Sequence, residues 1–335
     1  MNKLIILFSV LFLVSCNQSS DYMDLFHSAK EKTNNGDYSE AIDLLNDIIK
    51  LKPDFDSAYT ERAYNYLQIE KPKIALKDVN KAIKINFNNI SAYYTRGMIY
   101  SYLYKFDKAL KDYNHIIRLG DSIYMNVALR ERAYTYYYSN EIDKAIKDFS
   151  KIIELDSLSY ETYVSRGIAK LRSDVYNNYS DSIKTALLDT TLYAKFFEYF
   201  KITYTQNGYK NILYDTRGAI EDFSKAIKIK PDYSYAYYNR AKVFNDLKLT
   251  HQALTDINEA IKLTRNSDYY VTRGLIYKSI KVSEKSLNDF NKAIEINPEN
   301  GIAYINRAYL KREQLNDTKG AKKDIKTAEK FGIKY

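Results

Sequence analysis

Residues 93–117, YYTRGMIYSYLYKFDKALKDYNHII, decide the fold because their pattern recurs along the chain. The stretch opens with Tyr-x-x-Arg-Gly and continues into a second apolar segment that contains Ala109. Close variants of the opening start at Tyr59, Tyr163, Tyr237, Tyr270 and Tyr304. The recurrence indicates one structural unit used many times, so the tyrosines and the arginine of a single copy do not by themselves mark an active site.

The copies follow one another at a nearly constant period. The small residue of the second segment gives the series Ala41, Ala75, Ala109, Ala145, Ala219, Ala253, Ser286 and Ala321. Most steps are 33 to 36 residues, but the step from Ala145 to Ala219 is 74. Ser182 in YSDSIKTAL divides that step into two of 37, which predicts a degenerate extra unit and nine helix pairs. The alternative is eight pairs with a long insertion between Leu171 and Asp215.

Composition favours helices over sheet. The 335 residues include 35 Tyr but only 10 Gly and 4 Pro, and the formal net charge is +9. Gly97, Gly167 and Gly274 stand where other copies have alanine. Glycine costs about 1 kcal/mol against alanine inside a helix, so its use there indicates that a second helix crosses closely at this position.

Two amphipathic helices in a unit of this length resemble the tetratricopeptide repeat. The family's aromatic and small positions are occupied by Tyr93, Gly97, Tyr100, Ala109 and Tyr113 in the copy that starts at Ile90. The family's closing proline is present as Pro53, Pro231 and Pro298, while its tryptophan is never used. The resemblance implies an all-α superhelical solenoid of about eight to nine antiparallel helix pairs over residues 22–335. Residues 173–214 are its degenerate or inserted part.

The first sixteen residues, MNKLIILFSVLFLVSC, predict export and lipid attachment. Lys3 precedes an apolar run that is shorter than the roughly 20 residues needed to span a bilayer, which suits a signal peptide. Residues 13–16, LVSC, resemble the lipobox of bacterial lipoproteins, which implies cleavage before Cys16 and a lipid on its sulfur. The alternative is an ordinary signal peptide followed by a chance cysteine.

These features divide the N-terminal region into a signal peptide over residues 1–15 and a short membrane tether over residues 16–21. The protein is then expected in the cell envelope, held by its lipid. No aspartate follows Cys16, which favours the outer membrane and leaves the facing direction open.

An arginine in the first helix and an aspartate in the second recur in register. The arginines are Arg62, Arg96, Arg132, Arg240, Arg273 and Arg307, and the aspartates are Asp78, Asp112, Asp148, Asp256, Asp289 and Asp324. Arg166 and Asp222 continue the series across the long step. Because both charges recur, we expect a structural Arg–Asp ladder, to which the planar guanidinium is suited. The alternative is a row of arginines that binds a polyanion.

The resemblance also implies that partners bind on a concave face lined by first-helix residues. On this chain those positions include Tyr64, Tyr94, Met98, Tyr102, Tyr134, Tyr137, Tyr138, Tyr235, Tyr238 and Tyr309. Tyrosine combines apolar area with a polar tip at small entropy cost, which suits binding of a peptide or a helix. The alternative is that a tyrosine-rich chain carries tyrosine everywhere.

The sequence offers no catalytic constellation. His27, His115 and His251 lie at different repeat positions, and no cysteine or histidine cluster has metal-ligand spacing. No glycine-rich phosphate loop is present either. We therefore expect no enzyme, no cofactor and no metal, and the dispersed charge argues against nucleic acid. The expected function is a scaffold that binds a protein or peptide partner, and the alternative is capture of a glycan or nutrient at the cell surface.

Overall fold

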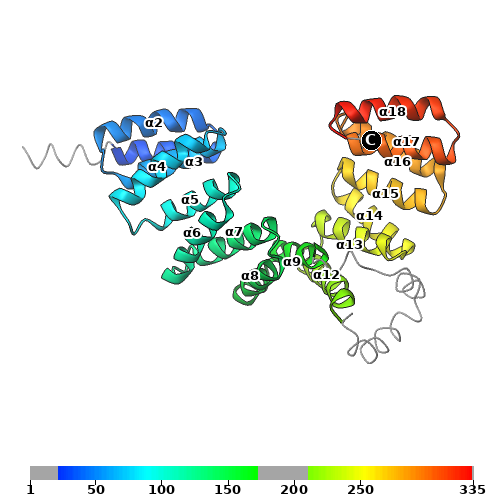
Figure 1. The fold of residues 1–335 in the computed structure, drawn as a ribbon, viewed down its shortest axis with the longest axis horizontal. Coiled ribbons are helices and arrows are strands. Elements are labelled where there is room, and N and C mark those ends of the chain that lie inside the picture. The colour runs from blue at the N-terminus through cyan, green and yellow to red at the C-terminus, as the bar shows by residue number, and fades with distance from the viewer. Residues whose placement is uncertain (1–21, 173–209, 334–335) are drawn as a thin grey trace, which may run out of the picture. The chain divides into compact units, whose positions relative to one another are not determined.

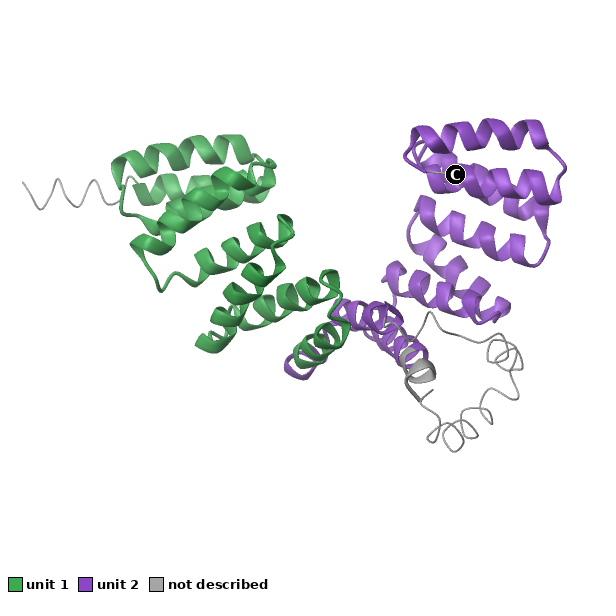
Figure 2. Cartoon of the chain, in the orientation of Figure 1, with its two compact units in different colours: residues 1–152 green, residues 153–335 purple. Residues whose placement is uncertain are grey.

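The computed structural model describes residues 22–172 and 210–333, and every regular element within these ranges is an α-helix (Figure 1). Consecutive helices pack against one another in pairs, so the fold is a solenoid of helix pairs, as the period predicts. The chain divides into two compact units, residues 1–152 and 153–335, which Figure 2 shows in different colours. Each unit is described by itself below.

The first unit begins with a helix over residues 22–35. It continues with α2 (Tyr38–Leu51), α3 (Asp56–Gln68), α4 (Pro72–Ile85), α5 (Ile90–Tyr102), α6 (Phe106–Leu119), α7 (Met125–Tyr138) and α8 (Ile142–Leu155), in which the boundary between the units falls. α3 packs against α4, and α5 packs against α6. Pro72 stands in the first turn of α4, where its missing N–H is not needed.

The second unit contains α9 (Tyr160–Arg172), α12 (Lys210–Ile229), α13 (Ser234–Asp246), α14 (Thr250–Leu263), α15 (Ser267–Ser279), α16 (Ser283–Ile296), α17 (Gly301–Gln314) and α18 (Thr318–Lys330). α13 pairs with α14, α15 with α16, and α17 with α18. Its other pair is α9 with α12, although many residues separate them in the sequence.

α9 and α12 pack together like the helices of the other pairs, although the long step separates them in the sequence. Arg166 bonds to Asp222, and Gly167 lies against Phe223, as in the other pairs. α9 and α12 are therefore the two helices of one unit, and the described residues contain eight pairs. Ser182 and the rest of the expected degenerate unit up to residue 209 lie outside the described residues.

The crossing glycines meet an aromatic ring of the partner helix. A Cβ added at Gly97 would lie 2.5 Å from Cε1 of Tyr113, and one added at Gly274 would lie 2.7 Å from Cε1 of Phe290. Both rings are fully buried. Only glycine leaves the second-helix ring room to lie against the first-helix backbone at these crossings.

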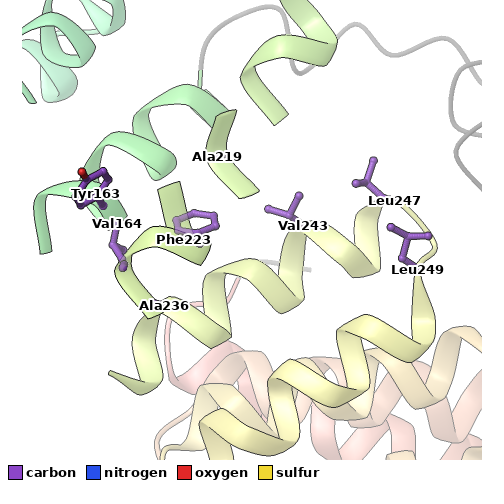
Figure 3. Packing of buried hydrophobic residues seen from close by; sticks show 9 residues of the cluster. Tyr163, Val164, Ala219, Phe223, Ala236, Val243, Leu247 and Leu249 are labelled. Carbon is purple, nitrogen blue, oxygen red and sulfur yellow. The ribbon is translucent and has the colours of Figure 1, made fainter. Parts of the chain in front are cut away.

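Buried apolar side chains also connect consecutive pairs. In the second unit, Phe223 of α12 belongs to one cluster with Val164 of α9 and Val243 of α13 (Figure 3). Ala219 of α12 and Ala236 of α13 belong to the same cluster. Each pair thus buries surface that only its neighbour can cover, so stability is shared along the stack.

Candidate functional site

Each arginine of the ladder donates two hydrogen bonds to the aspartate of its own helix pair. Arg62 donates from Nε and Nη2 to the two carboxylate oxygens of Asp78, at 2.7 and 2.8 Å. The same two contacts, at 2.6 to 3.0 Å, join Arg96 to Asp112, Arg132 to Asp148, Arg166 to Asp222, Arg240 to Asp256, Arg273 to Asp289 and Arg307 to Asp324.

The third nitrogen of the guanidinium reaches back to the preceding pair. Nη1 of Arg62 donates to Asn46 of α2 at 2.7 Å, and Nη1 of Arg273 donates to Asn258 of α14 at 2.8 Å. The corresponding acceptors of the other arginines are Asn80, Asn114, Ser224 and Asn291. These polar residues were missed in the sequence, although they recur with the same period. One side chain therefore joins three helices.

The ladder is largely removed from water. Its arginine side chains are 17 to 21% exposed and its aspartate side chains 2 to 12%. The hydrogen bond to Asp112 raises the pKa of Arg96, and Asp289 does the same for Arg273. All three guanidinium nitrogens bond to protein atoms in Arg62, Arg96, Arg132, Arg240, Arg273 and Arg307, which leaves little of these groups for a polyanion.

The first helices of the first unit form a continuous face. α5 packs against both α3 and α7, so side chains of the three helices lie next to one another. A hollow of about 360 Å³ opens on this face and is lined by Leu67, Gln68, Glu70, Met98, Ser101, Tyr102 and Glu131. Two of the predicted partner-binding residues, Met98 and Tyr102, are thus brought together at one depression.

Three of the predicted tyrosines are exposed. Tyr102 is 49% exposed and Tyr138 is 65% exposed, in the first unit, and Tyr235 of the second unit is 40% exposed. Tyr138 meets the ring of Tyr137 edge to face, with the ring centres 5.5 Å apart. These side chains are available to a partner without disturbing the core.

Other predicted tyrosines take part in packing. Tyr134 meets the fully buried ring of Phe149 edge to face at 5.4 Å, and Tyr94 lies 6.4 Å from the ring of Tyr113. In the second unit, Tyr238 stacks on the buried ring of Tyr269 at 4.8 Å. For these side chains a structural role is observed, so they are poor probes of a binding face.

The remaining predicted positions are half-buried. Tyr64 lies on α3, where burial raises its pKa. Tyr309 of α17 has the Nζ of Lys278 and the guanidinium of Arg312 over its ring, each 5.3 Å from the ring centre. In the second unit, therefore, two cationic side chains cover the ring of Tyr309.

Two glutamates of the first-helix face were missed in the sequence. Glu61 and Glu131 each precede a ladder arginine, in TERAY and RERAY. Burial raises the pKa of Glu131 and outweighs the effect of Arg130, whose Nε lies 3.6 Å from Oε1. Burial likewise raises the pKa of Glu61 against the opposing charge of Lys30. The recurring Glu-Arg-Ala-Tyr could have revealed them.

The charge of Glu131 also affects the hydroxyl of Tyr94. Burial, and then the charge of Glu131, raises the pKa of Tyr94 to about 12, so its hydroxyl stays protonated and can donate a hydrogen bond. The face therefore combines apolar area, hydroxyl donors and a carboxylate at partial burial. This set can bind a ligand but contains no nucleophile paired with a base.

The ranges 22–172 and 210–333 show neither a metal cluster nor a membrane span. No group of three or more His, Cys, Asp or Glu side chains within them could hold a metal ion. None of their helices is long and apolar enough to cross a membrane. Cys16 and the signal sequence lie outside these ranges.

The fold and its three-helix ladder define a helical-repeat protein. Three of the repeats match the tetratricopeptide repeat family, at residues 90–119, 234–267 and 267–300. These segments contain α5 with α6, α13 with α14, and α15 with α16.

Solved structures of repeat proteins share the fold. A tetratricopeptide repeat protein from Parabacteroides merdae superposes with a TM-score of 0.56 at 18% identity, covering 92% of this chain and 99% of that one. The C-terminal part of a repeat protein from Cytophaga hutchinsonii gives 0.54 at 16% identity, with 84% and 98% covered. The human IFIT1 dimer with m7Gppp-AAAA gives 0.51 at 13%, with 89% and 68% covered. Similarity at this level establishes the fold and leaves the ligand class open.

Proposed function

We propose that this protein is a non-enzymatic scaffold that binds a protein or peptide partner on the first-helix face of residues 22–152. The hollow formed by α3, α5 and α7 carries the proposal, because it joins apolar walls to a few polar groups on an otherwise regular stack. Concave sites of this kind are the usual places for ligand binding. Tyr102 of α5 and Tyr138 of α7 provide exposed aromatic area on two of these helices.

The test replaces exposed tyrosines and measures recovery of the partner from native envelopes. Tyr102→Ser combined with Tyr138→Ser is expected to abolish recovery and to preserve helical circular dichroism, because neither ring is buried. Tyr104→Ser is the matched control, since Tyr104 is 81% exposed but lies in the turn between α5 and α6. Full recovery with the double variant contradicts the proposal. Binding of a soluble oligosaccharide to the face, lost in the same variant, favours glycan capture instead.

We further propose that a lipid on Cys16 tethers the protein to the cell envelope, with the outer membrane as the site. The LVSC sequence at residues 13–16 supports this. Each buried CH₂ of an acyl chain contributes about 0.8 kcal/mol, so two or more chains hold the protein durably. Cys16→Ala is expected to abolish labelling with radioactive palmitate and partitioning into detergent. Undiminished labelling of the variant contradicts the anchor.

A further inference from the structure

The hollow on the first unit has two chemically different sides. Leu67, Met98 and the ring of Tyr102 form apolar walls, and Glu131 places a carboxylate at its edge. Glu70, in the turn between α3 and α4, adds a second acidic group at the rim. A side chain with an apolar stem and a cationic head matches this arrangement, since such side chains bury the stem and keep the charge at the polar end.

Glu131 lacks a strong partner within the protein. Its side chain is 28% exposed, and its contact with Arg130 is long, at 3.6 Å, with an arginine that is 45% exposed. The other titratable groups around it, Tyr94, Tyr113 and Glu70, carry no positive charge. The carboxylate has therefore lost water without gaining a close cation, in contrast to every aspartate of the ladder.

A second polar group next to the hollow is also unsatisfied. The hydroxyl of Tyr113 is fully buried and has no hydrogen-bond partner among the described residues. Its neighbour Ser101, which lines the hollow, shares a 3.1 Å hydrogen bond with Thr135 of α7. Unpaired buried polar groups destabilise a fold, and they concentrate where a protein keeps a site for a ligand.

We propose that this hollow receives a lysine or arginine side chain of the partner, with its stem on Leu67, Met98 and Tyr102 and its cationic head at Glu131. The inference rests on the proposed function and specifies the chemistry of the partner: an extended segment in which a basic residue is flanked by apolar ones. The attraction is local, because the chain as a whole has a net charge of +9. A charge-assisted contact in a partly dry site is stronger than one at an exposed surface.

A selection from a phage-displayed library of random heptapeptides tests the inference directly. The full-length protein is used beside Glu131→Gln, which keeps the shape and removes the charge, and Glu299→Gln, a control in the exposed turn before α17. The wild type and the control are expected to enrich lysine or arginine at one position next to apolar residues. Glu131→Gln is expected to lose that enrichment. Peptides without a basic position, or the same enrichment in all three proteins, overturn the inference.

The selected peptide is then compared with a copy in which norleucine replaces the basic residue. By fluorescence anisotropy, this change is expected to weaken binding to the wild type by about tenfold or more and to leave binding to Glu131→Gln nearly unchanged. Circular dichroism checks that each variant is folded. Equal affinity of the two peptides for the wild type overturns the inference.

The failure of the inference can be told from failure of the proposed function. If Tyr102→Ser with Tyr138→Ser abolishes recovery of the native partner while Glu131→Gln leaves it complete, the face binds its partner without a basic anchor. If neither variant affects recovery, the proposed function itself is contradicted. If both the double tyrosine variant and Glu131→Gln abolish recovery, the proposed function and the inference are both supported.

Discussion

The two units use the same ladder but differ at the residue that precedes each ladder arginine. In the first unit this position holds Glu61, Thr95 and Glu131, and in the second it holds Ser165, Asn239, Thr272 and Asn306. The Arg–Asp contacts have the same length in both units, within 2.6 to 3.0 Å. The hollow with its carboxylates lies in the first unit. Cations lie over aromatic rings in both units, as Lys108 does over Tyr100 and Lys278 over Tyr309.

The comparison separates the contacts that stabilise every repeat from the groups that occur in only some repeats. A contact that recurs in every pair, such as Arg96 with Asp112, stabilises the packing of repeats. A group that occurs in only some repeats and has one long ion pair, such as Glu131 with Arg130, is not needed for that packing. The differences between units are therefore the place to look for specific binding, and the predictions below test this division.

The largest expected effect comes from breaking the ladder in either unit. Asp112→Ala in the first unit and Asp289→Ala in the second leave a guanidinium partly buried without its carboxylate. Each is expected to lower the free energy of unfolding by about 2–4 kcal/mol. Urea denaturation measures both, and the exposed Asp54→Ala is the control that should leave the midpoint unchanged. A loss in one unit only would contradict a shared structural ladder.

A second effect, of intermediate size, concerns the glycine crossings. Gly97→Ala and Gly274→Ala push a methyl group into the rings of Tyr113 and Phe290 and are expected to cost about 1–3 kcal/mol each. Thermal unfolding measures the loss. Gly218→Ala is the control with a smaller expected effect, because its added Cβ would meet the Lys170 side chain, which also pairs with Asp222, at 3.0 Å rather than a fully buried ring. Equal melting temperatures for wild type and both crossing variants would show that the rings move aside freely.

The smallest expected change in the free energy of unfolding is the most informative for this comparison, because it is a stabilisation rather than a loss. Glu131→Gln is expected to stabilise the protein at pH 7, by less than about 1 kcal/mol, since the partly buried carboxylate loses its charge and only a long ion pair with Arg130 is lost. Glu299→Gln, in an exposed turn, should change nothing. Destabilisation by Glu131→Gln would mean that the charge serves the fold.

The pH dependence of this effect follows from the direction of the shift. Because burial raises the folded-state pKa of Glu131 above its unfolded value near 4.3, its favourable contribution is fully present below that unfolded value and is lost as pH rises through the folded-state pKa. The stability advantage of Glu131→Gln is therefore expected to be absent at pH 4 and to grow towards pH 7. Urea titrations of both proteins at several pH values measure it, and a constant difference would contradict the assignment.

The sequence predicts the features that repeat. The helix pairs, the small residues at the crossings and the pairing of arginine with aspartate are all visible, because each appears several times at a fixed spacing. Asn46 and its equivalents repeat too, but an asparagine on a second helix has the composition of solvent-facing surface, so its bond to the ladder arginine shows only in three dimensions.

The sequence predicts less well the burial and the contacts of individual side chains. Tyr94 and Tyr134 occupy positions assigned to the binding face, yet their rings also contact Tyr113 and Phe149 of the core. The sequence does not show how far a first-helix side chain is tilted towards the partner helix. Likewise, the cost of burying Glu131 depends on neighbours from α5 and α6, which the spacing along one helix does not reveal.

Site-specific photocrosslinking in native envelopes tests the central claim, that a partner binds the first-helix face of the first unit. p-Benzoylphenylalanine is placed at Tyr102, and the control position is Phe87, which is 72% exposed in the turn between α4 and α5. The account predicts a discrete crosslinked product at Tyr102, weakened by Glu131→Gln and absent at Phe87. No product at Tyr102, or the same product at both positions, would contradict it.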